Sequence, residues 1–395
     1  MYIFKAIALL CASFLFLGLQ AQVSNIEGIL EEIEKNNSEL KSIAHYYESK
    51  KLLLKSGNNL PDPQIGGYFL PFGEYTGDAY TEFQISQSFD FPTVYSARNK
   101  MIKQNGLSLD IEYRKKRQGL LLQAQQHCIA LISINKRLEI EKKRATDSKK
   151  VYQHNEALFE KKQVGTLDLN KAKIAWLQGR FKLEQLEKER SNSILVLKTL
   201  NGGKPIDFSV TDFNDVPIAL EKDSLWKAKL SSDPRHEQFQ QQRLIAEQQL
   251  KLSKSYALPK ITAGYNYQGN AAENYSGLYA GISIPLWSNR NKVNAAKSNL
   301  EFRETSITFK TEIAYSEFEK QFQEYEVLLS EFTEYKKTLN ALNSEELLFK
   351  AYDLGEISFL EYYLELQFYR TAVDSFLDIE KRLFQVQAQL LKHQL

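Results

Sequence analysis

Residues 255–286, SYALPKITAGYNYQGNAAENYSGLYAGISIPL, decide the fold. The stretch is rich in Tyr and Gly, and a proline stands near each end. Apolar and polar residues alternate in both halves, which is the pattern of a β-strand with one apolar and one polar face. The stretch therefore predicts a hairpin over 258–286 with a loop at 269–276. The alternating apolar residues are Ile261, Ala263, Tyr265 and Tyr267, then Leu278, Ala280, Ile282 and Ile284.

An earlier stretch, residues 59–92, has the same character. From residue 82 to residue 91, Phe83, Ile85 and Phe89 alternate with polar residues. Together with the alternation upstream, this pattern predicts a first hairpin over 60–91 with a loop at 72–78. Strands of roughly ten residues have the length that crosses a bilayer when they are tilted.

A long region without proline follows each hairpin, and in both regions charged and apolar residues mix at helical spacing. The first region predicts a helix over 93–162, on the order of 100 Å long at 1.5 Å per residue. This first region also predicts a turn at 163–167 and a second helix that ends at Asn201-Gly202-Gly203. In the second region the lone Gly355 predicts a turn at 353–357, because a glycine inside a helix is unfavourable.

A helix is also expected before each hairpin. Ser24 and Glu27 have the spacing of a capping box, so the first such helix is predicted over 24–56. The second is predicted over 221–256, with a break at Ser232-Asp233-Pro234. The short mixed segment 205–220 predicts a linker that lies between two similar halves.

The two halves form a repeat. Matching segments recur at a spacing of about 190 to 198 residues, and one match sets 158–165, which ends in Gly165, against 348–355. The predicted organisation is a first repeat over 22–204, an equatorial linker and a second repeat over 221–395. The predicted fold class is mainly α with a β-barrel contribution, built from a duplicated helix–β-hairpin–helix unit.

Composition excludes several classes of function. The formal charge of +2 gives no reason to expect nucleic acid as a partner. The block Lys142-Lys143-Arg144 is interpreted as a solvated helix face. The five histidines are scattered and no cysteines cluster, so neither a catalytic constellation, nor a metal site, nor a cofactor site is expected. We therefore expect a protein that is not an enzyme.

The N-terminus resembles a secretory signal peptide over 1–21, with an apolar run that ends before Ala21. Cys11 lies within that run without the small residue before it that a lipoprotein site needs, so no lipid anchor is expected. Cys128 is then the only remaining cysteine, which excludes an internal disulfide. No later apolar run is long enough for a transmembrane helix.

Four bilayer-length strands cannot close a barrel by themselves, because open strand edges are not tolerated in lipid. Single-chain barrels need at least about eight strands, so the chain is expected to contribute part of a barrel that several copies share. The strand count alone is compatible with two copies or with three.

The two predicted turns contain the motifs Val164-Gly165-Thr166 and Leu354-Gly355-Glu356. These tip motifs, the duplicated plan and the proline-bounded strands together resemble the TolC-type outer-membrane efflux family. The resemblance implies a homotrimer with a shared 12-stranded barrel in outer-membrane lipid and a long α-helical tunnel in the periplasm. It also implies a periplasmic membrane-fusion (adaptor) protein and an inner-membrane pump of the RND or ABC type as partners. In that family the tip turns close the periplasmic end and dock the adaptor. The corresponding gate or docking candidates are Val164, Gly165, Thr166, Leu354, Gly355 and Glu356.

The resemblance adds one further candidate, an acidic ring just inside the tip. Glu361 stands six residues after Gly355 and matches one position of that ring, and its alternative is an ordinary solvated carboxylate. The next expected position is Leu364, which departs from the pattern, and Glu365 stands beside it. At the strand exit, Trp287 is expected either in an interfacial aromatic girdle or in packing at the barrel base.

These observations favour an outer-membrane exit duct for small molecules or metal ions that an inner-membrane pump energises. A duct for secreted proteins in a type I system has the same fold and remains an alternative. A periplasmic coiled-coil scaffold without a barrel is the alternative from another class, and the alternating strands argue against it.

Overall fold

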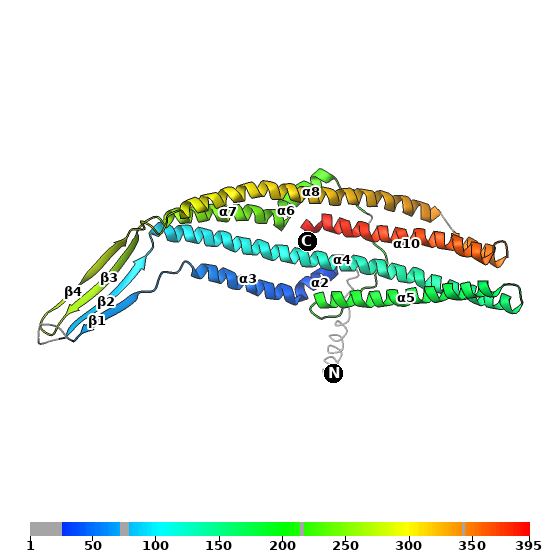
Figure 1. Cartoon of the computed structure of the whole chain (residues 1–395), viewed down its shortest axis with the longest axis horizontal. Helices are drawn as coiled ribbons and strands as arrows, with labels where there is room; N and C mark the ends of the chain where they lie inside the picture. The colour runs from blue at the N-terminus through cyan, green and yellow to red at the C-terminus, as the bar shows by residue number, and fades with distance from the viewer. Residues whose placement is uncertain (1–25, 72–78, 214–216, 342–343) are drawn as a thin grey trace, which may run out of the picture. The chain divides into compact units, whose positions relative to one another are not determined.

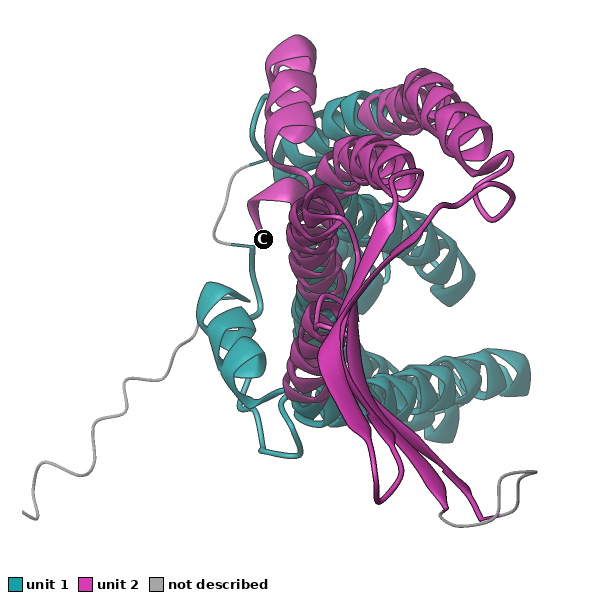
Figure 2. Cartoon of the chain, turned by 90° about the vertical axis from the view of Figure 1, so that its left-hand side faces the viewer, with its two compact units in different colours: residues 1–38, 120–219, 323–391 teal, residues 39–119, 220–322, 392–395 magenta. Residues whose placement is uncertain are grey.

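The computed structural model describes residues 26–71, 79–213, 217–341 and 344–395. The predicted signal peptide, Ser24 of the expected capping box and the predicted loop 72–78 lie outside these residues. The chain divides into two units, coloured separately in Figure 2. Each unit takes segments from both sequence repeats, and each is described below by itself. Unit 1 comprises 1–38, 120–219 and 323–391, and unit 2 comprises 39–119, 220–322 and 392–395.

The order of elements along the described chain confirms the predicted fold class (Figure 1). Each repeat has two short helices, a hairpin, a long helical region, a turn and a final helix, and in the second repeat the long helical region is described as two helices. The first repeat contains α2 (Ile26–Asn36), α3 (Ser38–Ser56), β1 (Gln64–Leu70), β2 (Tyr80–Phe89), α4 (Pro92–Glu160) and α5 (Thr166–Leu200). The second contains α6 (Lys222–Ser232), α7 (Pro234–Ser255), β3 (Lys260–Gly269), β4 (Asn274–Ser283), α8 (Lys292–Ala341), α9 (Ser344–Asp353), α10 (Phe359–Leu390) and the 3₁₀ turn η1 (Lys392–Gln394).

The predicted break before Pro234 is present, because Asp233 caps α7 through its side chain, which accepts a hydrogen bond from the Arg235 amide at 2.9 Å. The prediction of one unbroken helix up to residue 56 was wrong. The chain breaks at Asn37, whose side-chain amide donates to the Leu200 carbonyl at 2.7 Å. The predicted loop 269–276 was too long, since β3 and β4 leave only 270–273 as the connection.

All four strands lie in one antiparallel sheet of order β1-β2-β3-β4, within unit 2 (Figure 2). The central pair joins the two repeats, with Ile85 opposite Tyr265 and Gln84 opposite Asn266. In this register most apolar residues of the four strands share one face and most polar residues share the other, with Leu70, Tyr68 and Tyr279 among the exceptions. Leu278 on the apolar face is 93% exposed, so nothing in the described chain covers it.

The polar face carries hydroxyl and amide side chains together with several tyrosines, and the Ser88 and Thr262 hydroxyl groups lie 3.0 Å apart across β2 and β3. Gly264 is required there, because a Cβ atom at that position would lie 2.5 Å from the Ile85 carbonyl oxygen. In the described strands, β1 and β4 have no further neighbour, which leaves two open edges.

The helices of unit 2 pack through an aromatic cluster. Trp226 of α6 lies 5.2 Å from Phe318 of α8 and 5.5 Å from His236 of α7, measured between ring centroids. Phe318 is fully buried and His236 is 6% exposed, so the imidazole lies in a largely apolar environment. This cluster fixes α6, α7 and α8 against one another.

The helices of unit 1 also bury apolar residues from both repeats, including Leu131 of α4 and Leu383 of α10. The Tyr325 hydroxyl donates to the Ile218 carbonyl at 2.6 Å and so ties the linker segment to α8. Within the described ranges, no helix combines the length and the apolar character that a membrane span requires.

Candidate functional site

The first tip turn, between α4 and α5, ends its helix with a Schellman motif. The Lys162 amide donates to the Phe159 carbonyl at 2.9 Å, and the Gln163 amide donates to the Leu158 carbonyl at 2.9 Å. The motif requires a left-handed residue, and Lys162 takes that position with φ 60°. The helix therefore ends before the predicted turn at 163–167 begins.

The second tip turn, between α9 and α10, repeats this geometry around a glycine. Gly355 has φ 76°, its amide donates to the Tyr352 carbonyl at 3.0 Å, and the Glu356 amide donates to the Ala351 carbonyl at 2.9 Å. Gly355 is thus the structural counterpart of Lys162. The sequence match that set Gly165 against Gly355 is displaced by three residues from this correspondence.

Gly165 takes a different part in the turn, because it is the N-cap of α5 with an ordinary φ of −86°. Its counterpart is Ser358, the N-cap of α10. Gly165 provides no side-chain cap, whereas Ser358 does. Of the remaining tip candidates, Val164 is half-buried and Thr166, Leu354 and Glu356 are exposed.

Glu361 is held in a capping box with Ser358. The Glu361 carboxylate accepts a hydrogen bond from the Ser358 amide at 2.8 Å, and the Ser358 hydroxyl accepts one from the Glu361 amide at 3.2 Å. The bond from the Ser358 backbone lowers the pKa of this fully exposed carboxyl, so it is ionised at neutral pH. The Leu364 side chain, at the position where the pattern departs, is 58% exposed.

The two helix hairpins that carry the tip turns pack against each other within unit 1. Tyr352 of α9 stacks on Tyr362 of α10 with ring centroids 5.1 Å apart. Burial raises the pKa of Tyr362 to about 12, so its phenol stays neutral. The buried members of this tip cluster are Val151, Ala172, Tyr352, Phe359, Tyr362 and Leu366, from α4, α5, α9 and α10.

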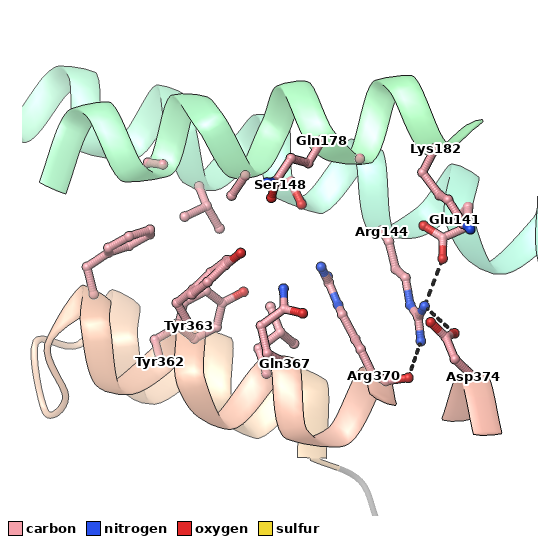
Figure 3. Close-up of a pocket in the computed structure, with 16 residues that line it drawn as sticks. Glu141, Arg144, Ser148, Gln178, Lys182, Tyr362, Tyr363, Gln367, Arg370 and Asp374 are labelled. Atoms are coloured by element: carbon pink, nitrogen blue, oxygen red, sulfur yellow. Dashed lines mark hydrogen bonds and ion pairs between the residues drawn. The ribbon is translucent and has the colours of Figure 1, made fainter. Parts of the chain in front are cut away.

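A cavity of about 230 Å³ adjoins the tip cluster between α4, α5 and α10 (Figure 3). Arg144, 4% exposed, reaches across it from α4 and donates to the Glu141 and Asp374 carboxylates at 2.8 Å each. A third bond, of 3.5 Å, runs to the Arg370 carbonyl. Arg370 also faces the cavity, and its Nε lies 3.5 Å from the Glu345 carboxylate.

Comparison with known proteins finds a shared fold without a detectable sequence relationship. No family model matches the sequence, and no curated protein matches it. The structure matches the Campylobacter jejuni outer membrane channel CmeC with a TM-score of 0.72 at 15% identity, over 93% of this chain and 85% of that chain. It matches CusC, described with transmembrane channel formation, with a TM-score of 0.76 at 15% identity, over 96% and 95% of the two chains. The open state of the Neisseria gonorrhoeae channel MtrE matches with a TM-score of 0.69 at 13% identity, over 94% and 88%.

The chain has the TolC-type fold. The family resemblance implies that the tip turns form the gate. In the structure, the helices that carry both turns belong to unit 1 and pack through the tip cluster. Whether those residues gate or dock a partner stays a prediction. Among the residues that the structure describes, no group of three or more His, Cys, Asp or Glu side chains is placed to hold a metal ion.

Sequence reasoning missed Arg144 in this TolC-type chain. The block Lys142-Lys143-Arg144 was interpreted as a solvated helix face, and this is wrong for Arg144, which is among the most buried charged residues of unit 1. Its partner Asp374 stands 230 residues away on α10. A basic block among acidic neighbours gives no signal that one of its members points inward.

Proposed function

We propose that this chain is the outer-membrane channel of a tripartite efflux system, a passive exit duct for small molecules or metal ions. An inner-membrane pump of the RND or ABC type supplies the energy and acts through a periplasmic adaptor. The observation that supports this most directly is the four-stranded sheet, with one bare apolar face, one polar face and two open edges. Lipid tolerates such a sheet only when its edges are closed by other strands.

Three copies of the chain close the sheet in this proposal. The edges belong to β1 and β4, so β4 of one copy pairs with β1 of the next, and a homotrimer gives the shared 12-stranded barrel. The apolar face then meets lipid, and the polar face, with Gln84 opposite Asn266, lines a wet lumen. The likeness to solved outer-membrane channels supports this arrangement.

The gate of the duct lies at the two tip turns in this proposal. The turns are capped by Schellman motifs and held by the tip cluster, so they have a defined geometry that an adaptor can recognise. Leu354 is 63% exposed at the second turn, and an apolar side chain in that position suits docking of a partner helix.

The test begins with location and assembly. We expect the protein in the outer-membrane fraction, extractable only with detergent, as a trimer whose electrophoretic migration changes on heating. In planar bilayers it should conduct, and loosening of the second turn by Gly355→Ala should raise the conductance. Release from membranes without detergent would establish the scaffold alternative and refute the duct.

The cargo is tested separately. Deletion of the gene should raise the cellular accumulation of fluorescent dyes or metal ions, and complementation should reverse it. A normal dye and metal balance together with the loss of one secreted protein would instead establish the type I secretion alternative. A crosslink from position 354 to an adaptor would support the docking assignment.

A further inference from the structure

The segment 284–292, between β4 and α8, presents an apolar surface that the described chain leaves uncovered. Trp287 is 81% exposed, Leu286 is 68% exposed and Ile284 is 66% exposed. Ile284 continues the alternation that places Ile282, 71% exposed, on the apolar face of β4, and Leu286 and Trp287 follow directly in the chain. Four large apolar side chains exposed within six residues mark an interaction site.

The segment is a built structure of consecutive turns. The Leu286 amide donates to the Ile284 carbonyl at 3.0 Å, and the Arg290 amide donates to the Trp287 carbonyl at 3.2 Å. The Asn289 side-chain amide donates to the Tyr256 carbonyl and so fastens the segment to the end of α7. Asn291 is left-handed with φ 63°, a conformation that Asn tolerates better than most residues. These bonds hold Trp287 outward in a defined position.

The charges around this patch have one sign. No acidic residue stands between Glu273 and Glu301, while Arg290, Lys292 and Lys297 fall in that interval. Lys297 lies 3.8 Å from the Glu301 carboxylate. Arg290 and Lys292 are exposed, and neither forms an ion pair with any residue that the structure describes. Two cations without an ion-pair partner among the described residues therefore directly follow the exposed apolar side chains.

The corresponding exit of the first repeat is closed instead. Asp90 follows β2 and pairs with Arg98 at 2.6 Å and with Lys260 at 3.2 Å. The side chains of Asp90 and Arg98 are only 11% and 13% exposed, and the Arg98 guanidinium also donates to the Tyr256 hydroxyl at 2.9 Å. One exit thus satisfies its charges internally, whereas the other offers them outward.

We propose that residues 284–292 bind the headgroup of an anionic phospholipid, an inference that rests on the proposed barrel. Trp287 lies at the boundary between acyl chains and headgroups, where indole rings are preferred. Arg290 and Lys292 contact the phosphate of the same lipid, and their aliphatic stems lie along the apolar patch. The two positive charges match the phosphate of an anionic phospholipid, and the exposed apolar side chains match its acyl chains.

A second copy of this chain is the rival occupant. Among the described residues of β1 and the segment leading into it, 57–71, Asp62 is the only acidic one, so this part of a neighbouring copy offers one carboxylate to the two cations. The exposed side chains of Ile282 and Ile284 continue the apolar face of the sheet, whereas a neighbouring copy approaches at the strand edge. Both observations favour lipid.

The test uses the full-length protein reconstituted in nanodiscs with brominated phospholipids, which quench nearby indoles. The chain has three tryptophans, so the difference between the wild type and Trp287→Phe isolates the signal of Trp287. We expect brominated phosphatidylglycerol to compete with unbrominated phosphatidylcholine for this site. The relative binding constant of phosphatidylglycerol over phosphatidylcholine should rise by about fivefold for each of the two cations.

The double variant Arg290→Gln/Lys292→Gln should lose most of this preference. Lys336→Gln, an exposed lysine further along α8, should retain it and serves as the matched control. Equal preference in the wild type and the double variant would overturn the proposal. A change in Trp287 emission and trimer stability with Asp62→Asn, without any dependence on lipid charge, would assign the surface to a second copy.

The proposed function and this inference fail in different ways. If the protein neither conducts nor shows Trp287 quenching by any lipid, the barrel itself is refuted and the inference with it. If the protein conducts normally and Trp287 is quenched without regard to headgroup charge, only the headgroup site is refuted.

Discussion

Lys162 and Gly355 occupy the same position in the two tip turns: each is the left-handed residue that completes the Schellman motif at the end of its helix. A residue with a Cβ atom pays about 1–2 kcal/mol for this conformation, and glycine avoids most of that cost. We therefore expect Gly355→Ala to lower the free energy of unfolding by about 1 kcal/mol. Lys162→Gly should raise it by a smaller amount, because glycine also gains entropy in the unfolded chain. Urea unfolding in detergent, followed by circular dichroism, measures both.

Gly165→Ala is the matched control for that pair. Gly165 has an ordinary φ, and a Cβ atom there would meet nothing within 4 Å, so the substitution causes no strain. Ala is a poorer N-cap than Gly but loses less entropy on folding, so the two effects oppose each other and a net change of only a few tenths of a kcal/mol is expected. Equal losses at Gly165 and Gly355 would show that the left-handed geometry does not govern the stability of the tips.

The capping box lets the charge of Glu361 be separated from its structural role. Gln serves in a capping box as Glu does, so Glu361→Gln should keep the helix start while removing the charge. If Glu361 contributes to an acidic ring in the lumen, this variant will lower the cation-to-anion permeability ratio in planar bilayers. Its unfolding midpoint should stay close to that of the wild type.

Ser358→Ala gives the converse result. It removes the cap and keeps the carboxylate, so it should cost about 1 kcal/mol of stability and leave ion selectivity nearly unchanged. Loss of selectivity in Ser358→Ala, with none in Glu361→Gln, would assign the permeability effect to helix geometry and refute an acidic ring.

Arg144 is expected to be the most sensitive charged residue near the tips. Arg144→Met leaves the Glu141 carboxylate, whose side chain is 12% exposed, without its partner, and breaking a buried pair in this way costs about 3–5 kcal/mol. The exposed pair of Arg180 and Glu184, 3.5 Å apart on α5, provides the control. Arg180→Met should cost less than about 1 kcal/mol. Similar losses in both variants would contradict the importance of burial.

His236 predicts a loss of stability in acid. Burial lowers the pKa of this imidazole below its ordinary value of 6.5, so the unfolded chain binds the proton more readily than the folded chain. Stability is then greatest above about 6.5 and declines as the pH falls from there towards the folded pKa. His236→Phe should flatten this decline in urea unfolding measured across that range. His45→Phe, at an exposed position on α3, should leave it unchanged.

Much of the fold could be predicted from the sequence because its signals are local. The alternation around Tyr265 determines which side chains share a face, and Pro234 after Asp233 marks a helix break without reference to any other segment. The single glycine at 355 correctly located the second tip turn. Such features depend on backbone geometry over a few residues, which a single sequence records directly.

The unpredicted features depend on distant partners or on unusual residues. Lys162 adopts a left-handed conformation that sequence patterns reserve for glycine, so the first helix end was placed too late and the tip repeat was matched three residues out of register. The break at Asn37 contains neither proline nor glycine and depends on Leu200. The inward position of Arg144 depends on Asp374.

The pairing of β2 with β3 has a consequence for how the proposed ring is assembled. This seam joins the two repeats within one chain, and in a trimer the seam between β4 and the next β1 is its counterpart between chains. In such a ring, three of the six contacts between repeats form within a chain, and only the three contacts between chains depend on protein concentration. Because of the duplication, three chains rather than six separate hairpin units must meet to close the barrel. Insertion and trimer formation become a single event, since no copy has a closed sheet before the last one arrives.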